Sequence, residues 1–153
     1  MAIPPLDERG LLPAGEHGCR LDEVPPRFCV NDHRTALWGS LCNQFIPALR
    51  ANDLGPEDAR MVVGGSFFSD KPQPADIEAT LVFPDDTPDA ECWKSIVLWK
   101  HNHTRWKDAF RIDYYPTLPG NNNFALYFGY VGPKPAEAKG LNEKDLRGTL
   151  ALE

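Results

Sequence analysis

The first strong periodicity in the chain is helical. Apolar residues recur at i, i+1, i+4 and i+8 shortly after Asn31 and Asp32. Either residue is a good N-cap, so a helix is predicted from there to about Phe45. Pro47 is expected to end or kink it, because proline lacks the N–H that a helix interior requires. The face that this helix would bury is formed by Leu37, Trp38, Leu41 and Phe45.

A second helical pattern follows Thr87. Pro88 suits the first helical position, and acidic residues in the next turn complement the helix dipole. Apolar residues then continue at helical spacing. The sequence therefore predicts a helix that runs to about Arg105.

Short apolar or alternating runs between glycines and prolines predict strands. They cover residues 60–64, 76–83 and 110–115, and another is expected within residues 124–131. The order of these elements predicts a mixed α/β (α+β) fold, in which a small mixed β-sheet is flanked by helices.

A chain of 153 residues is about the length of one domain. Five of the 15 prolines precede residue 27, and no periodicity accompanies them. Residues 1–27 are therefore predicted to form an irregular N-terminal arm laid over a single domain of residues 28–153. The segment from Pro133 onward is not predicted to be disordered, because its leucines can be buried.

Composition and charge exclude several classes of protein. The net charge of −6 argues against a general nucleic-acid coat, although it allows a local basic site. There is no run of about 18 apolar residues that could span a membrane, and the N-terminus lacks the features of a secretory signal, so we expect the cytoplasm. The four cysteines form no CxxC pair and are expected to be reduced.

The stretch after the first predicted strand suits phosphate chemistry. That strand runs into Gly64, Gly65 and Ser66, where small residues leave backbone N–H groups accessible to a phosphate. In the next strand Asp76 and Glu78 are two residues apart, so both carboxylates point to the same face. Paired carboxylates beside a phosphate site are typical of Mg²⁺ binding.

A third carboxylate, Asp113, lies in the next predicted strand. The helix between the two strands would let them lie side by side, which would bring Asp113 to Asp76 and Glu78. Three carboxylates would complete a two-metal site. One metal would activate an acceptor hydroxyl and the other would neutralise a leaving pyrophosphate, and Asp113 would contact the first metal and accept the proton.

The order Gly-Ser, a spacer of about ten residues, Asp-x-Glu and a later strand Asp resembles the signature of the polymerase-β-type nucleotidyltransferase superfamily, in particular its minimal single-domain members. The resemblance implies that Gly65 and Ser66 bind the phosphates of an NTP. It also implies that Asp76, Glu78 and Asp113 hold Mg²⁺ or Mn²⁺. The signature spans residues 62–113. Members more often have Asp at the position of Glu78.

The segment after residue 133 is similar to that of small bacterial and phage proteins with the same signature. Lys139 and Arg147 match it and are candidate phosphate or nucleic-acid contacts. Lys71, between the Gly-Ser turn and the carboxylates, is a further candidate for the nucleotide phosphates. No added domain for an acceptor is visible, so RNA, a protein or a small molecule remains open, and a dimer or a partner protein could cover that side.

Two other interpretations stay open. The chain could be a catalytically inactive protein of the same fold that binds a partner, as an antitoxin or a phage-encoded inhibitor of host defence would. It could also be a small RNA-binding domain that uses the basic stretch of residues 94–111, in which aromatic residues are interspersed with basic ones. Trp93 is expected to be buried there as part of an amphipathic helix. The candidate contacts are Arg105, Lys107 and Arg111.

Overall fold

The computed structural model describes residues 3–55, 57–120 and 123–153. In these ranges the chain forms a five-stranded mixed sheet with the strand order β1-β5-β2-β3-β4. Strand β2 is antiparallel to both of its neighbours, whereas β3 and β4, and also β1 and β5, are parallel pairs. The predicted mixed α/β class is confirmed. The strands are β1 (Gly15–Cys19), β2 (Arg60–Gly64), β3 (Ile77–Val82), β4 (Ile112–Thr117) and β5 (Gly148–Leu152).

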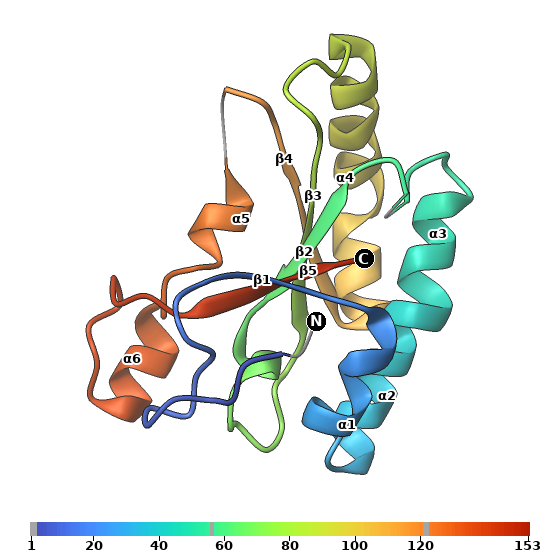
Figure 1. The fold of residues 1–153 in the computed structure, drawn as a ribbon. Helices are drawn as coiled ribbons and strands as arrows, with labels where there is room; N and C mark the ends of the chain where they lie inside the picture. The colour runs from blue at the N-terminus through green and yellow to red at the C-terminus, as the bar shows by residue number, and fades with distance from the viewer. Residues whose placement is uncertain (1–2, 56, 121–122) are drawn as a thin grey trace.

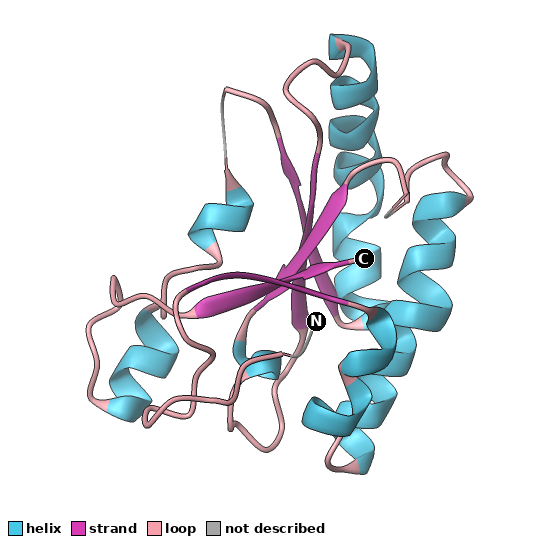
Figure 2. Cartoon of the chain, in the orientation of Figure 1, coloured by secondary structure: helices cyan, strands magenta, loops and turns pink. Residues whose placement is uncertain are grey.

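The two faces of the sheet differ in chemistry. One face is apolar and belongs to the main core, because alternate residues of four strands are buried there. Helices α1 to α4 lie on this side, and α5 and α6 lie on the other (Figures 1 and 2). The core residues from the strands are Cys19, Met61, Val63, Ile77, Ala79, Leu81, Ile112, Tyr114, Leu150 and Leu152.

The first long helical segment begins as predicted. Asn31 caps α2 (Asp32–Ser40) by accepting a hydrogen bond from the backbone N–H of Arg34. The segment does not end at Pro47, because a π-helical stretch, η2 (Leu41–Phe45), precedes α3 (Ile46–Arg50) and shifts the helical register ahead of the proline. The predicted apolar face is buried.

Helix α4 (Asp89–Phe110) is longer than predicted. It connects β3 to β4 along the chain and lies on the apolar face of the sheet (Figure 1). Arg111 ends it in the left-handed conformation. Trp106 is buried against Phe45 and Tyr114, whereas Trp93 is 62% exposed, so its predicted burial is wrong.

The other side of the sheet carries two short helices, α5 (Phe124–Tyr127) and α6 (Pro133–Lys139). The strand expected within residues 124–131 is therefore wrong. Asn123 caps α5, and Phe124 stacks on Tyr115 of β4 at a ring distance of 4.8 Å. A short apolar run is compatible with a strand or with a helix. Here the run forms a helix, and Phe124 of that helix stacks on Tyr115.

The N-terminal segment is more regular than expected. It contains β1, a 3₁₀ turn η1 (Leu21–Glu23) and α1 (Pro25–Phe28). The prediction of an irregular arm is wrong for these residues, because β1 forms an edge of the sheet and pairs with β5. Its two glycines and few apolar residues obscured the strand.

Two expectations about the chain's chemistry can be compared with the structure. All four cysteines are free thiols, as predicted. Within the described ranges no helix is both long and apolar enough to cross a membrane.

Candidate functional site

The turn after β2 lies directly against the acidic strand. Gly65 has a φ of 92°, and a Cβ at this position would lie 3.3 Å from Cγ of Glu78. A larger residue would therefore be strained and crowded here. The chain continues into one 3₁₀ turn, η3 (Ser66–Phe68), before Pro72.

The register of β3 and β4 brings the predicted carboxylates together. Glu78 lies opposite Asp113, while the preceding pair, Ile77 and Ile112, points into the core. Glu78 and Asp113 therefore share the face that carries α5 and α6. Asp76 directly precedes β3 and, two residues from Glu78, belongs to the same face.

Burial and mutual repulsion set the protonation of this acidic cluster. Burial raises the pKa of Asp76, and the nearby charge of Asp113 raises it further. The pKa of Glu78 is also raised, mainly by burial and then by the other two carboxylates, although Arg147 acts against this. Because these half-buried carboxylates repel one another, a cation bound between them would stabilise their ionised form.

Protein cations contact two of the carboxylates. Nη2 of Arg147 lies 3.8 Å from Oε2 of Glu78, and Nζ of Lys107 lies 3.4 Å from Oδ2 of Asp113. Tyr115 donates a hydrogen bond to the same oxygen of Asp113 at 3.2 Å.

In the described part of the chain, no group of three or more His, Cys, Asp and Glu side chains is placed to hold a metal ion. By its chemistry the donor set still fits a hard divalent cation, because Asp76, Glu78 and Asp113 supply carboxylate oxygens from one sheet face and repel one another without a cation.

Two carboxylates of the acidic cluster face a cleft of about 1150 Å³, whereas Asp113 and Gly65 are not among the residues that line it. Ser66, Asp76 and Glu78 line it on the sheet side. On the opposite side, α6 and the segments on either side of it supply the wall. Of the other candidates, Lys71, Lys139 and Arg147 line the cleft. The remaining lining residues are Leu11, Ser69, Asp70, Pro72, Ala75, Tyr127, Tyr130, Val131, Gly132, Pro133, Lys134, Pro135, Ala138, Glu143 and Lys144.

The basic stretch of α4 lies outside the lining of this cleft. Arg105, Lys107 and Arg111 are exposed. Arg105 donates to the side chain of Asn102, and Lys107 contacts Asp113. The structure thus connects one of the three basic candidates, Lys107, to the acidic cluster.

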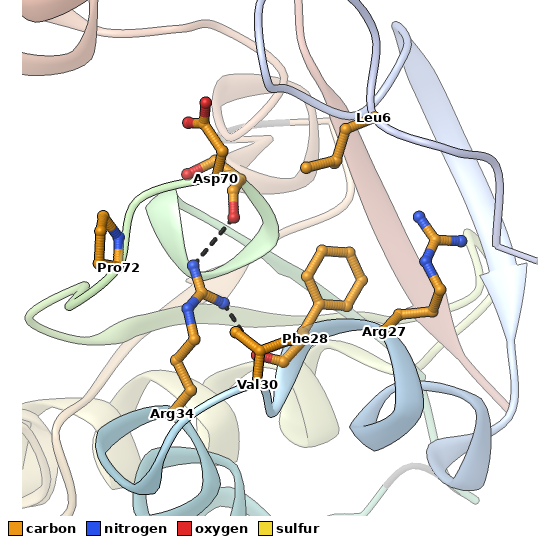
Figure 3. Close-up of a pocket in the computed structure, with 8 residues that line it drawn as sticks. Leu6, Arg27, Phe28, Val30, Arg34, Asp70 and Pro72 are labelled. Carbon is orange, nitrogen blue, oxygen red and sulfur yellow. Dashed lines mark hydrogen bonds between the residues drawn. The ribbon is translucent and has the colours of Figure 1, made fainter.

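A residue that the sequence analysis missed shapes the loop between the turn and the carboxylates. Arg34 is only 2% exposed. Its side chain donates hydrogen bonds to the backbone carbonyls of Phe28, Phe67, Ser69 and Lys71. Figure 3 shows its guanidinium beside a cavity of about 230 Å³, with two of these bonds dashed. A basic residue three positions before Leu37, on the apolar face of a helix, is a signal that could have identified it.

Lys139 ties three segments together at the rim of the cleft. Its Nζ donates to the carbonyl of Arg9 at 2.6 Å and to Oδ1 of Asp70 at 2.8 Å. The backbone N–H of Asp70 in turn donates to the carbonyl of Gly10. The N-terminal segment therefore fixes both the loop after η3 and the end of α6.

The fold and the site define a mixed α/β domain in which two carboxylates of an acidic cluster line one wall of a large cleft. The chain belongs to a family of unknown function (DUF6932), whose model matches residues 4–143. Searches of curated proteins and of solved structures found no match. The family description names no activity, so the nucleotidyltransferase resemblance stays a prediction.

Proposed function

We propose that the protein is a metal-dependent nucleotidyltransferase that moves a nucleoside monophosphate from an NTP to an acceptor hydroxyl. One observation carries the proposal: the β3–β4 register sets Asp113 opposite Glu78, at the point where Gly65 packs against Glu78. Ser66 of the phosphate turn and the carboxylates of Asp76 and Glu78 line one cleft, and Asp113 lies beside Glu78 in the sheet.

The chain's own groups define the reaction. Asp76, Glu78 and Asp113 would hold Mg²⁺ or Mn²⁺, and the turn at Gly65 and Ser66 would bind the phosphates. When bound, the metal supplies a lowered pKa for the acceptor hydroxyl and a positive charge facing the pyrophosphate. The acceptor oxygen forms a bond to the α-phosphorus, the bond to pyrophosphate breaks, and a carboxylate of the cluster takes the hydroxyl proton.

The size of the cleft suits two ligands. Its volume of about 1150 Å³ exceeds the roughly 300–1,000 Å³ of typical small-molecule sites. An NTP would leave room for part of an acceptor, which can belong to an RNA, a protein or a small molecule. The open side of the cleft is where a partner or a second copy would dock.

The ion pair between Arg147 and Glu78 favours a second candidate function. It engages a carboxylate that the metal needs, so the same cleft could bind a nucleotide or a partner protein without catalysis. Such a binder would keep its ligand when the acidic residues are neutralised. An RNA-binding role through Arg105, Lys107 and Arg111 would instead depend steeply on salt.

Thermal shift with each NTP, with and without Mg²⁺ or Mn²⁺, tests the proposal, because a ligand of the folded state raises the Tm. Asp76→Asn is compared with Asp85→Asn, which changes an exposed acid outside the cleft lining. We expect a metal-dependent shift that only Asp76→Asn abolishes.

Release of labelled pyrophosphate from [γ-³²P]NTP then separates the candidates. Pyrophosphate release that requires both Asp76 and an added cell extract as the source of acceptor supports nucleotide transfer. A nucleotide shift that survives Asp76→Asn, without pyrophosphate release, supports the inactive binder. The absence of any nucleotide or metal shift in the wild-type protein contradicts the nucleotidyltransferase proposal.

A further inference from the structure

The wall opposite the carboxylates carries exposed aromatic side chains. Tyr127 and Tyr130 both line the cleft, and Tyr127 is 65% exposed. Within the described residues, neither hydroxyl has a hydrogen-bond partner in the chain. The ring of Tyr127 packs edge-on against Phe124 at 6.3 Å and stays largely exposed, and exposed aromatic rings at a cleft are suited to stacking against a flat ligand.

The backbone beneath these rings is held in place. Phe124 stacks on Tyr115 at 4.8 Å with an angle of 18° between the rings, and Phe128 is buried. These contacts anchor both ends of α5 to the sheet. Tyr127 is therefore exposed on a fixed helix, and a ligand that meets its ring does not have to order the segment first.

The charge of the cleft adds a second requirement for the ligand. Although the chain has a net charge of −6, the described residues that line the cleft include five basic and four acidic side chains. Lys139 and Arg147 are engaged in ion pairs. Lys71, Lys134 and Lys144 form no ion pair with another described residue, so three cations remain for an anionic ligand.

We propose that the base of the nucleotide stacks against Tyr127 and Tyr130, while Lys71, Lys134 and Lys144 attract its phosphates. This inference rests on the proposed function, because it assigns the part of the ligand that the carboxylates do not contact. A nucleotide combines the flat ring and the anionic chain that the two tyrosines and the three lysines are suited to bind.

The test separates the base from the phosphates. Isothermal titration compares Mg·ATP with Mg·tripolyphosphate, which has the same phosphate chain without base or ribose. In Tyr127→Ala/Tyr130→Ala we expect ATP to bind about tenfold more weakly, at the lower end of the range for loss of a stacked base, and tripolyphosphate to bind unchanged. Tyr127→Phe should bind ATP as the wild type does.

Leu126→Ala is the matched control. Leu126 lies on the same helix and is 64% exposed, but it does not line the cleft. Its replacement should leave both affinities unchanged. A triphosphate of 2-aminopurine riboside gives a direct signature, since stacking quenches its fluorescence, and the quenching should fall only in Tyr127→Ala/Tyr130→Ala.

The outcomes distinguish the two proposals. If ATP binds more tightly than tripolyphosphate and the double tyrosine variant keeps that difference, the stacking inference is overturned while the proposed function stands. If the wild-type protein binds neither ligand, or if Asp76→Asn leaves Mg²⁺-dependent ATP binding unchanged, the proposed function fails and the inference fails with it.

Discussion

Two buried arginines, Arg34 and Arg147, satisfy their charge in different ways. Arg34 lies beside the core and donates five hydrogen bonds to four backbone carbonyls. In the described structure it forms no ion pair with a carboxylate. The side chain of Arg147 is 9% exposed and lines the cleft, where it contacts Glu78 at 3.8 Å and donates to the carbonyl of Phe128 at 3.3 Å.

The comparison separates a structural charge from an exchangeable one. The partners of Arg34 are fixed parts of the backbone, and its bonds to the carbonyls of Phe67 and Ser69 are 2.6 and 2.9 Å long, so this guanidinium holds residues 67–71 in one conformation. The contact of Arg147 with Glu78 is long, and burial lowers the pKa of Arg147 and raises that of Glu78. Under the proposed function, we therefore expect a bound metal ion to take the place of Arg147 beside Glu78.

The largest effect is expected from Arg34→Met. It removes the donors from four carbonyls, and each unsatisfied buried polar group costs about 1–3 kcal/mol. We expect the free energy of unfolding to fall by about 4 kcal/mol or more, measured by urea denaturation.

Arg34→Lys keeps a positive charge but lacks the forked donors, so an intermediate loss of about 2 kcal/mol is expected. This variant covers the case in which Arg34→Met does not fold. A loss below about 1 kcal/mol in Arg34→Met, or equal losses in both variants, would show that the carbonyl bonds do not fix the loop.

A smaller, pH-dependent effect is expected from Arg147→Met. Arg147 lowers the pKa of Glu78, so its removal moves the folded-state pKa further above the ordinary value. The destabilisation is present above that pKa, where Glu78 must ionise, and disappears as the pH falls and Glu78 takes up a proton. We expect a loss of about 1–2 kcal/mol at pH 7.5 and a smaller loss at pH 5, from urea denaturation at both values.

Arg34→Met provides the contrast, because its carbonyl partners do not titrate and its loss should be the same at both values. A pH-independent loss in Arg147→Met would mean that Glu78 is not its main partner. It would thereby remove the distinction between the two arginines.

The smallest effect, with the opposite sign, is expected from Asp113→Asn. Asp113 lies opposite Glu78, and like charges in directly opposed positions destabilise a sheet by about 0.2–1 kcal/mol. Without metal, the variant should be slightly more stable than the wild type in thermal denaturation, and it should lose the stabilisation by Mg²⁺. Asp108→Asn, an exposed acid on α4, should change neither. A clear loss of stability in Asp113→Asn would place this carboxylate among structural residues.

The sequence predicted those parts of the site that depend on local pattern. Asp76 and Glu78 follow from strand alternation, and Asp113 follows from a helix that returns the chain to a neighbouring strand. Helix starts at Asn31 and near Pro88 were also visible, because capping and proline positions are local signals.

The missed parts depend on contacts between distant residues. Strand β5 is a five-residue segment whose place between β1 and β2 is determined by its partners, not by its own pattern. Nothing local indicates that Arg34 reaches carbonyls about 35 residues away. Tyr127 escaped notice as a cleft residue because its run was predicted as a strand.

The position of β5 has a consequence for the order in which the molecule is built. Strand β1 is hydrogen-bonded in the sheet to β5, and β5 fills the gap beside β2. During synthesis β1 therefore cannot pair with β5 until residues 148–152 have left the ribosome. Helices α2 to α4 can pack on β2, β3 and β4 before that point. Completion of the sheet also positions Arg147 at the cleft, so assembly of the site and completion of the fold coincide.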